Sequence, residues 1–250
     1  MTPRILGAVA ARVLNQLRHD HRTLGMLLVL PMLLMTLLWW MFKDSGPFFD
    51  QFGPALLALF PFIIMFLVTS VTTLRERSSG TLERLLAMPT GKVDFLGGYA
   101  VAFGVVAALQ SALAVALCVW VLDLDLAGPA WMLTVVAVVD AMLGTALGLF
   151  VSAFARTEFQ AVQFMPAIVI PQILLCGLFV PREQLPRVLE WVSDVLPLSY
   201  AVDAMSSVAA STSDAFAGVE PEVWTDLLII GAFVVGSLVL GAATLRRRTA

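Results

Sequence analysis

A short charged segment between two long apolar runs holds the residues best placed to transmit force. Residues 75–89 read Arg-Glu-Arg-Ser-Ser-Gly-Thr-Leu-Glu-Arg-Leu-Leu-Ala-Met-Pro. Ser79 or Gly80 can cap a helix there, and Glu83 would lie in its first turn, where the helix dipole favours an acid. Pro89 would end the helix. A capped helix offers a soluble partner a rigid surface to push, whereas a loop that only fixes topology needs basic residues but no cap.

The same region contains the nearest approach to a nucleotide-binding loop, and it does not match. A phosphate loop reads G-x-x-x-x-G-K-[ST]. Gly91 and Lys92 are present, but Leu86 stands at the first glycine and Val93 at the hydroxyl residue. We therefore expect ATP and Mg²⁺ to bind to a separate polypeptide. We also find no nucleophile beside a base and no metal-ligand spacing, so we predict no catalytic residue, no metal site and no cofactor on this chain.

Asp140 is the one acid near the middle of an apolar run. A charged side chain at the centre of a bilayer costs about 2.5 kcal/mol or more, so it marks a candidate functional site. One interpretation is a pore-facing or proton-linked carboxyl. The other is a carboxyl that hydrogen-bonds to a neighbouring helix, with Gln110 at similar depth as a partner. Gly144 and Gly148 follow at four-residue steps, a pattern that indicates close helix packing.

The composition places these residues in a membrane protein. Hydrophobic residues make up 60% and charged residues 13% of the 250 positions, and the mean hydropathy is +0.92. A spanning helix needs about 20 apolar residues. Six stretches qualify, which predicts an all-α integral membrane fold: residues 23–42, 53–74, 95–122, 130–154, 159–180 and 223–245.

The basic residues predict the orientation of these spans, because cytoplasmic loops carry an excess of Lys and Arg. Six spans place both termini on one side. That side holds 12 of the 15 basic residues, which are Arg4, Arg12, Arg18, Arg22, Arg75, Arg77, Arg84, Lys92, Arg156, Arg246, Arg247 and Arg248. The other side holds Lys43, Arg182 and Arg187. We therefore expect both termini to be cytoplasmic.

Two further segments flank the spans. Residues 1–22 are predicted to form an amphipathic interfacial helix, because Ile5, Val9, Val13 and Leu17 recur at four-residue steps. Its basic face is either an anchor to anionic headgroups or a docking surface for a partner. Residues 23–250 form a single six-helix domain. After the fifth span, two short helix-compatible runs meet at Pro197, which predicts a partly re-entrant hairpin on the outer face.

Two stretches carry a family resemblance. One contains Arg75-Glu76, Gly80-Thr81-Leu82-Glu83, Leu85 and Pro89. The other contains Met165-Pro166, Gly177-Leu178-Phe179-Val180-Pro181-Arg182-Glu183, Leu185-Pro186 and Leu196-Pro197-Leu198-Ser199-Tyr200-Ala201-Val202-Asp203-Ala204. They are similar to the cytoplasmic signature, and to the fifth helix and outer loop, of ABC-2 type transporter permeases. The resemblance covers nearly the whole chain and points to permeases of drug and antibiotic exporters. One departure is Met205, where many relatives have arginine.

The resemblance implies partners and a coupling helix. A permease of this kind is a type V exporter subunit that pairs with a second permease, identical or paralogous, and binds two copies of an ABC ATPase. It implies coupling roles for Arg75, Glu76, Arg77, Gly80, Thr81, Glu83, Arg84, Leu85 and Pro89. Arg156 and Glu158, between the fourth and fifth spans, correspond to a second contact near the ATPase.

Because the fifth helix borders the pore in this family, the resemblance also implies a substrate pathway. The candidate residues on that helix are Phe159, Gln160, Gln163 and Phe164, and Gln110 and Asp140 are added because they are polar residues deep in apolar runs. The four residues of the fifth span have a helical spacing that fits packing equally well. The candidate outer gate consists of Pro181, Pro186, Pro197 and Tyr200.

These observations predict a permease subunit of an ATP-driven exporter in a bacterial plasma membrane, with a hydrophobic or amphiphilic substrate and no role for nucleic acid. An exporter of polysaccharide or glycolipid shares the architecture. A stand-alone proton- or ion-coupled carrier is the alternative from another class; it predicts that Asp140→Asn abolishes transport and that no ATPase co-purifies. A non-transporting scaffold predicts neither transport nor ATPase stimulation.

Overall fold

Long helices build the part of the chain that the structure describes. The computed structural model describes residues 3–44, 48–78, 92–155, 157–211 and 220–244, and these contain helices and no strands. The elements are α1 (Pro3–His19), α2 (His21–Phe42), α3 (Phe48–Ser78), α5 (Lys92–Trp120), α6 (Ala130–Ser152), α7 (Glu158–Leu175), the 3-10 helix η1 (Arg182–Gln184), α8 (Arg187–Val195), α9 (Pro197–Ala210) and α10 (Pro221–Thr244). The predicted all-α fold is confirmed for these residues.

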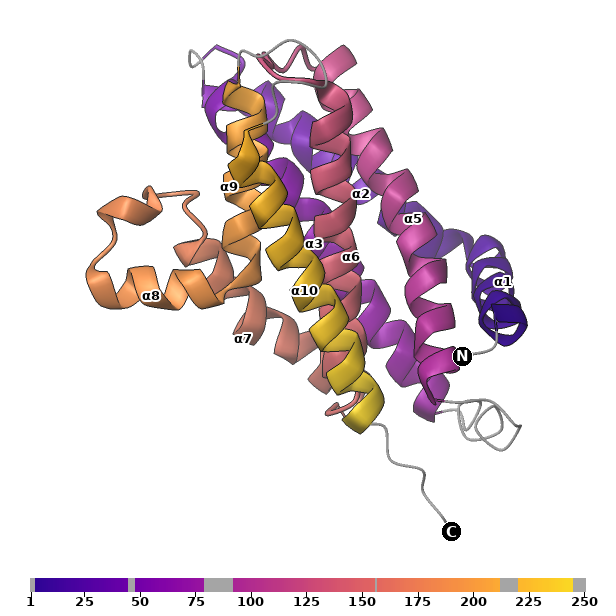
Figure 1. Cartoon of the computed structure of the whole chain (residues 1–250). Coiled ribbons are helices and arrows are strands. Elements are labelled where there is room, and N and C mark those ends of the chain that lie inside the picture. The colour runs from indigo at the N-terminus through magenta and orange to yellow at the C-terminus, as the bar shows by residue number, and fades with distance from the viewer. Residues whose placement is uncertain (1–2, 45–47, 79–91, 156, 212–219, 245–250) are drawn as a thin grey trace.

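Six of these helices are long and apolar enough to cross a membrane: α2, α3, α5, α6, α7 and α10. They correspond one to one with the six predicted spans. The central helix is α6, which packs against α3, α5, α9 and α10 (Figure 1). Its small residues explain this position, because a Cβ on Gly144 would lie 2.4 Å from the carbonyl oxygen of Phe62, and one on Gly148 would lie 2.6 Å from that of Phe66. The close packing predicted for these two glycines is confirmed.

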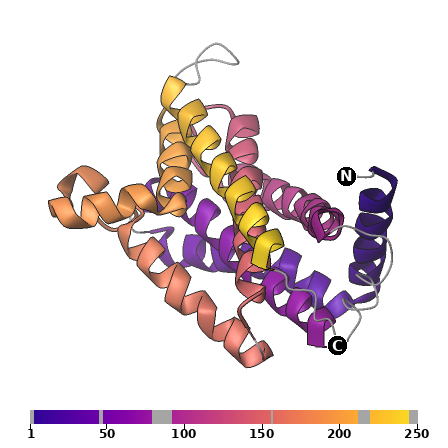
Figure 2. The same ribbon diagram turned by 60° about the horizontal axis from the view of Figure 1, so that its bottom comes forward.

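Helix α1 lies across the side of the bundle instead of running along it (Figures 1 and 2). It packs on α5 through Val9, Val13 and Leu17, which are buried. A Cβ on Gly98 of α5 would lie only 2.6 Å from Cβ of Val9, so this glycine lets the two helices approach closely. The apolar stripe of α1 therefore contacts protein rather than open membrane.

The chain turns from α1 into α2 at Asp20, which caps the second helix. Its carboxylate accepts hydrogen bonds from Thr23 Oγ1 at 2.6 Å and from the Thr23 amide at 3.2 Å. These hydrogen bonds hold the pKa of Asp20 below its ordinary value. An acceptor in this position satisfies an amide that the first turn of a helix leaves without a partner.

Replacing Asp20 with alanine should loosen the first turn of α2. Loss of an N-cap costs about 1 kcal/mol, so amide exchange near Thr23 should rise about fivefold at neutral pH. Because the folded-state pKa is lowered, the stabilisation is present above the ordinary pKa of the carboxyl and disappears as the pH falls through the lowered value. Hydrogen exchange with mass spectrometry measures this, with Asp20→Ser, which retains an acceptor, as the control. Equal exchange in the two variants would contradict a capping role.

The fifth spanning helix ends earlier than predicted. Residues 159–180 were expected to form one span, but α7 stops at Leu175, after 18 residues or about 27 Å. Gly177 has φ +90°, a backbone conformation that favours glycine and directs the chain out of the helix. The Leu175 carbonyl accepts a hydrogen bond from Ser193 Oγ at 2.7 Å instead. The apolar residues after 175 therefore belong to a turn and not to a longer span.

Two short helices follow this turn and differ in their surroundings. Helix α8 projects from the side of the bundle (Figure 1), and Ser193 is its one buried residue. Helix α9 packs back against α3, α6 and α10. Pro197 separates them, as predicted, and it also serves as the first residue of α9, where its fixed φ and missing N–H are tolerated.

Candidate functional site

Two consecutive residues at the end of α3 connect this helix to two other elements. Arg75 and Glu76 are about 100° apart around the helix axis, so they face different neighbours. Arg75 pairs with Glu158 at the start of α7, and Glu76 pairs with Arg12 of α1. We call these four residues the basal ion-pair cluster. Two of them, Arg75 and Glu76, begin the predicted coupling segment, residues 75–89.

The Arg75–Glu158 pair has two parallel hydrogen bonds. Nε donates to Oε1 at 3.0 Å and Nη2 donates to Oε2 at 3.1 Å. Both side chains are largely exposed, so water screens the pair and it contributes little to stability. Its fixed geometry matters more, because a two-pronged contact holds the end of α3 at one position relative to the start of α7. Thr157 caps α7 by accepting a hydrogen bond from the Gln160 amide at 3.2 Å.

The Arg12–Glu76 pair is more deeply placed. Arg12 Nη2 lies 3.4 Å from Glu76 Oε1, and the Glu76 side chain is only 8% exposed, whereas that of Arg12 is 36% exposed. A carboxylate at such a position depends on a nearby cation. From its helical angle, the sequence assigned Arg12 to the basic face of the predicted first helix, opposite the apolar stripe. The structure shows instead that it joins α1 to α3.

Several predicted coupling residues lie outside the described residues. These are Gly80, Thr81, Glu83, Arg84, Leu85, Pro89 and Arg156, and the side chain of Arg77 also lies outside the description. Of the predicted set, the structure therefore places Arg75, Glu76 and Glu158, and all three belong to the basal ion-pair cluster. Sequence reasoning selected these three residues but did not pair them, and it did not include Arg12.

The predicted pathway residues divide into two groups. Gln110 and Asp140 are fully buried, and their side-chain oxygens and nitrogens have no hydrogen-bond partner among the described residues. Ser111 Oγ donates to the Ala137 carbonyl at 3.1 Å, which fixes the register of α5 on α6. Helices α5 and α6 run in opposite directions. Gln110 precedes Ser111 by one residue and Asp140 follows Ala137 by about one turn, so both lie on the same side of this hydrogen bond and at a similar depth.

The second group lies on α7. Phe159 and Gln163 are exposed, whereas Gln160 and Phe164 are half-buried. The exposed residues continue along one side of α7 at helical spacing through Val162, Ile170 and Leu174. In the single chain, α7 thus presents an open, mostly apolar face with a polar side chain near its N-terminal end, while Asp140 lies inside the bundle.

Substituting Gly144 with alanine should destabilise the bundle. The nearest atom to a new Cβ is a backbone oxygen, which cannot rotate away, so α6 and α3 must separate. Overpacking of this kind costs about 1–3 kcal/mol. Gly236→Ala in α10 is the matched control, because nothing lies within 4 Å of its Cβ position and the change should be neutral or slightly stabilising. Thermal unfolding in detergent compares the two, and equal midpoints would contradict the close approach.

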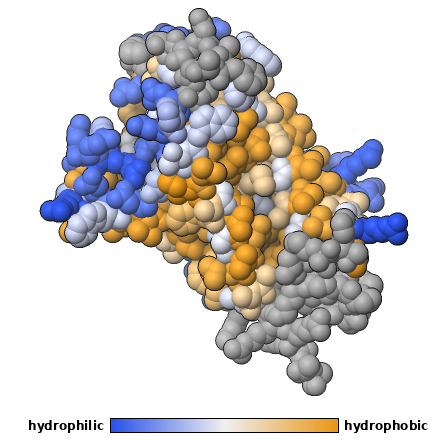
Figure 3. Space-filling view, in the orientation of Figure 1, coloured by the Kyte–Doolittle hydropathy of each residue, from blue (hydrophilic) through white to orange (hydrophobic). Residues whose placement is uncertain are grey.

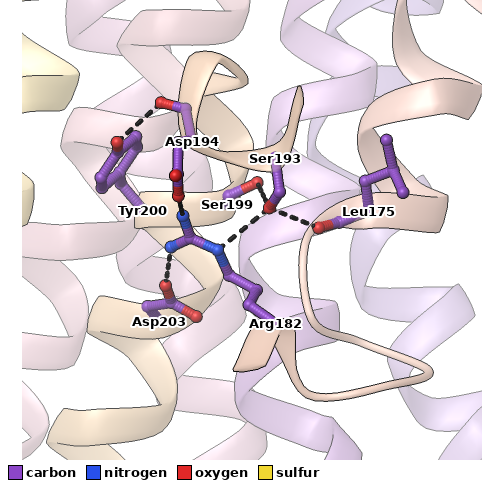
Figure 4. A network of polar contacts seen from close by, with 7 residues as sticks. All are labelled: Leu175, Arg182, Ser193, Asp194, Ser199, Tyr200 and Asp203. Atoms are coloured by element: carbon purple, nitrogen blue, oxygen red, sulfur yellow. Dashed lines mark hydrogen bonds and ion pairs between the residues drawn. The ribbon is translucent and has the colours of Figure 1, made fainter. Parts of the chain in front are cut away.

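A polar network centred on Arg182 holds the segment between α7 and α9 (Figure 4). The guanidinium donates from Nε to Ser193 Oγ at 3.0 Å and from Nη2 to Asp194 at 2.5 Å, and it also pairs with Asp203. Its side chain is 15% exposed. Burial raises the pKa of Asp203 above its ordinary value, although the hydrogen bond and charge of Arg182 act in the opposite direction. Arg182 thus connects η1, α8 and α9.

Hydroxyl groups extend this network to α7. Ser193 Oγ donates its proton to the Leu175 carbonyl, so the Ser199 hydroxyl, 3.0 Å away, must be the donor in their shared hydrogen bond. Tyr200 Oη donates to the Asp194 carbonyl at 2.7 Å, and Arg182 lies over the Tyr200 ring at 5.2 Å from its centroid. The network therefore fixes the end of α7 and all of α8 relative to α9.

The predicted outer gate residues surround this network unequally. Tyr200 belongs to it, and Pro197 is the first residue of α9. Pro186 and Pro181 precede α8 and η1 as their N-cap residues. Sequence reasoning counted Arg182 among three basic residues on the predicted outer side and quoted it in the family-like stretch, but it gave this residue no role of its own. The partners of Arg182 are polar side chains within moderately apolar stretches. Such a pattern indicates buried hydrogen bonds, but it does not show that Arg182 is their common partner.

The chain matches a known family over most of its length. Residues 5–209, from α1 to α9, match the family model described as ABC-2 type transporter. The chain is also 23% identical, over 207 residues, to ABC transporter G family member 20 of Dictyostelium discoideum. That stretch covers 82% of this chain and 28% of the relative.

Bacterial relatives are similar at comparable levels. The chain is 28% identical over 155 residues to the probable multidrug ABC transporter permease YbhR of Escherichia coli K12, covering 62% of this chain and 42% of the relative. It is 25% identical over 142 residues to the linearmycin resistance permease protein LnrN of Bacillus subtilis, covering 56% of this chain and 36% of the relative. The chain thus spans less than half the length of the curated relatives it matches.

Proposed function

Since the chain belongs to the ABC-2 type transporter family, we propose that it is the membrane-spanning permease of an ATP-driven exporter. The match over residues 5–209 carries this proposal. The substrate would be a hydrophobic or amphiphilic compound such as a drug, an antibiotic or a lipid. The names of two relatives, a probable multidrug permease and a linearmycin resistance permease, support this substrate class.

The motor would be a separate ABC ATPase, bound in two copies, that holds ATP and Mg²⁺. This chain would contribute no catalytic residue to hydrolysis. Residues 75–89 would form the coupling helix that the ATPase pushes, and the excess of basic residues on that side would place both termini in the cytoplasm of a bacterial cell. Helix α1 would then lie at the cytoplasmic interface of the plasma membrane.

The basal ion-pair cluster would carry the displacement from the coupling segment to the rest of the permease. A push on the segment after Ser78 first moves the end of α3. Because Arg75 is fixed to Glu158 and Glu76 to Arg12, the start of α7 and helix α1 would move with it. Rigid helices linked at one end in this way convert a local push into a tilt.

The substrate would cross between two permeases, either two copies of this chain or this chain and a paralogue. The exposed face of α7 supports this arrangement, because it is apolar along most of its length and carries Gln163 near its inner end. Such a face suits an amphiphile, which needs an apolar wall and a few polar contacts. On the outer side, η1, α8 and the start of α9 would form a partly re-entrant hairpin that closes the pathway.

A co-purification experiment tests this function. The tagged chain would be extracted from its native membrane in mild detergent, and its companions identified by mass spectrometry, with an unrelated six-span protein as control. A stoichiometric soluble protein with a phosphate loop supports the exporter, and a second permease in the same eluate would make it a heterodimer. If the chain elutes alone, even after crosslinking, the proposal that a separate ABC ATPase drives it would be refuted.

One observation favours a different function. Gln110 and Asp140 are buried without partners among the described residues, and a carboxyl in that position could titrate during transport. In a stand-alone proton- or ion-coupled carrier, Asp140→Asn would abolish transport driven by a pH gradient. In the exporter, the same change would leave ATP-driven transport largely intact.

A further inference from the structure

Three arginines in the N-terminal part of the chain have no ionic partner among the residues that the structure describes. Arg4 and Arg18 are exposed on α1, and Arg22 is exposed in the first turn of α2. None of them forms an ion pair with a described residue, in contrast to Arg12. Helix α1 contains no acid, and the carboxylate of Asp20 is occupied by Thr23. We call these three residues the arginine face.

The arginine face points away from the bundle. Positions 4 and 18 lie nearly opposite Val13, whose side chain packs on α5, around the helix axis. The close contact of α1 with α5 is at Gly98, six residues or about 9 Å from the start of α5. Helix α1 therefore lies beside the bundle and not beneath it. In Figure 3, hydrophilic residues project from the flank on which α1 lies in Figure 1.

Apolar surfaces begin directly next to this helix. Helix α5 exposes Val101, Val105, Leu109 and Leu113 at four-residue steps, starting one turn after Gly98. Helix α2 exposes Met26, Val29, Leu33 and Leu37, starting one turn after Arg22. These two stripes lie along spanning helices that pack together and both contact α1. The corner of α1, α2 and α5 thus combines cations at one end with two apolar walls along the membrane.

We propose that this corner is a binding site for an anionic phospholipid. The phosphate-containing headgroup would contact Arg18 and Arg22 of the arginine face, since Arg4 lies about 21 Å further along α1. The acyl chains would lie along the exposed stripes of α2 and α5. An anionic lipid fits both halves of the surface, because arginine binds phosphate in a two-pronged geometry and valine and leucine side chains pack against hydrocarbon. A docked soluble protein would satisfy the cations but would leave the apolar stripes without a partner.

The inference needs the chain to be a membrane protein, but it does not depend on the proposed function. Under the proposed orientation, the site would lie in the cytoplasmic leaflet, where juxtamembrane basic residues are attracted to anionic lipid. Each arginine near a charged membrane surface increases affinity by roughly fivefold. Loss of two arginines should therefore weaken anionic lipid binding by about 25-fold.

Native mass spectrometry of the purified chain tests the site. The full chain would be titrated with phosphatidylglycerol and, separately, with phosphatidylcholine. We expect the wild type to retain phosphatidylglycerol preferentially, and Arg18→Gln/Arg22→Gln to reduce this preference by about 25-fold. The matched control is Lys43→Gln/Arg187→Gln, which also removes two exposed cations but at the far end of α2 from Arg22 and on α8. It should bind as the wild type does.

Two further measurements decide between the outcomes. Raising the salt concentration to about 1 M should remove most of the preference in the wild type, because exposed charges are then screened within about 3 Å. Arg18→Lys/Arg22→Lys should keep most of the binding that the glutamine variant loses. Equal phosphatidylglycerol binding by the wild type and the glutamine variant, or a preference that salt does not affect, would overturn the proposal. The proposal would also be overturned if the glutamine variant kept its lipid preference but lost a co-purifying ATPase, because the arginine face would then bind that protein.

Discussion

Replacing Arg182 with methionine is expected to release α8 from the bundle. The substitution keeps an apolar stem of similar length but removes hydrogen bonds to Ser193, Asp194 and Asp203. Asp203, whose side chain is 38% exposed, would lose its cation. Because water screens a carboxylate this exposed, we expect a cost of about 1–2 kcal/mol, below that of breaking a fully buried pair. The pKa of Asp203, already raised by burial, should rise further without Arg182.

Hydrogen exchange along α8 measures this release, because the helix has few other contacts with the bundle. We expect its amides to exchange about tenfold faster in Arg182→Met than in the wild type. Arg187→Met is the matched control: Arg187 is exposed and lies over the Trp191 ring at 5.3 Å from its centroid, a contact worth about 0.5–1 kcal/mol. Arg182→Lys should resemble the methionine variant, since lysine cannot reproduce the planar fork. Unchanged exchange in Arg182→Met would show that other contacts hold α8.

The second large effect concerns Arg12 and Glu76. Arg12→Leu leaves the Glu76 carboxylate, which is 8% exposed, without its cation from α1. The half-exposed position of Arg12 and the 3.4 Å separation reduce the cost of a broken buried pair, so we expect about 1–2 kcal/mol of destabilisation. We also expect transport to fall at least tenfold, because α1 would no longer follow the end of α3.

A double substitution separates these two effects. Arg12→Leu/Glu76→Leu replaces the ion pair with apolar groups, which should restore most of the stability because no charge remains buried. Transport should stay low if the pair carries motion between α1 and α3. Thermal unfolding in detergent and substrate uptake into inside-out vesicles give the two readouts. Wild-type transport in the double variant would exclude a coupling role for this pair.

The elements that sequence predicted well are those whose signal is local. Twenty apolar residues in a row have few alternatives to a spanning helix, so all six spans lie where composition placed them. The fifth was predicted too long because the residues after Leu175 remain apolar. The helix ends because Gly177 adopts a positive φ and because the Ser193 hydroxyl donates a hydrogen bond to the Leu175 carbonyl. Ser193 follows Leu175 by eighteen residues. Composition does not contain that information.

The contacts of the candidate site depend on pairings that spacing does not reveal. Arg75 and Glu158 are 83 residues apart, and Arg12 and Glu76 are 64 apart. Helical periodicity correctly gave α1 an apolar face, but it assigned Arg12 to the opposite face from its angle alone. A long side chain near the edge of the polar face can reach sideways to a neighbouring helix, and only the position of α3 shows that it does.

The Arg182 network also bears on the order in which the protein assembles during synthesis. Its partners Ser193, Asp194 and Asp203 follow Arg182 by 11, 12 and 21 residues. Closing such short loops costs little chain entropy. The Arg182 network, with η1, α8 and the start of α9, can therefore form before α10 has been synthesised. The basal ion-pair cluster, by contrast, must wait until α7 has emerged and met the end of α3. The end of the bundle that carries α8 is thus a local folding unit, whereas the basal ion-pair cluster is completed only when segments made far apart in time come together.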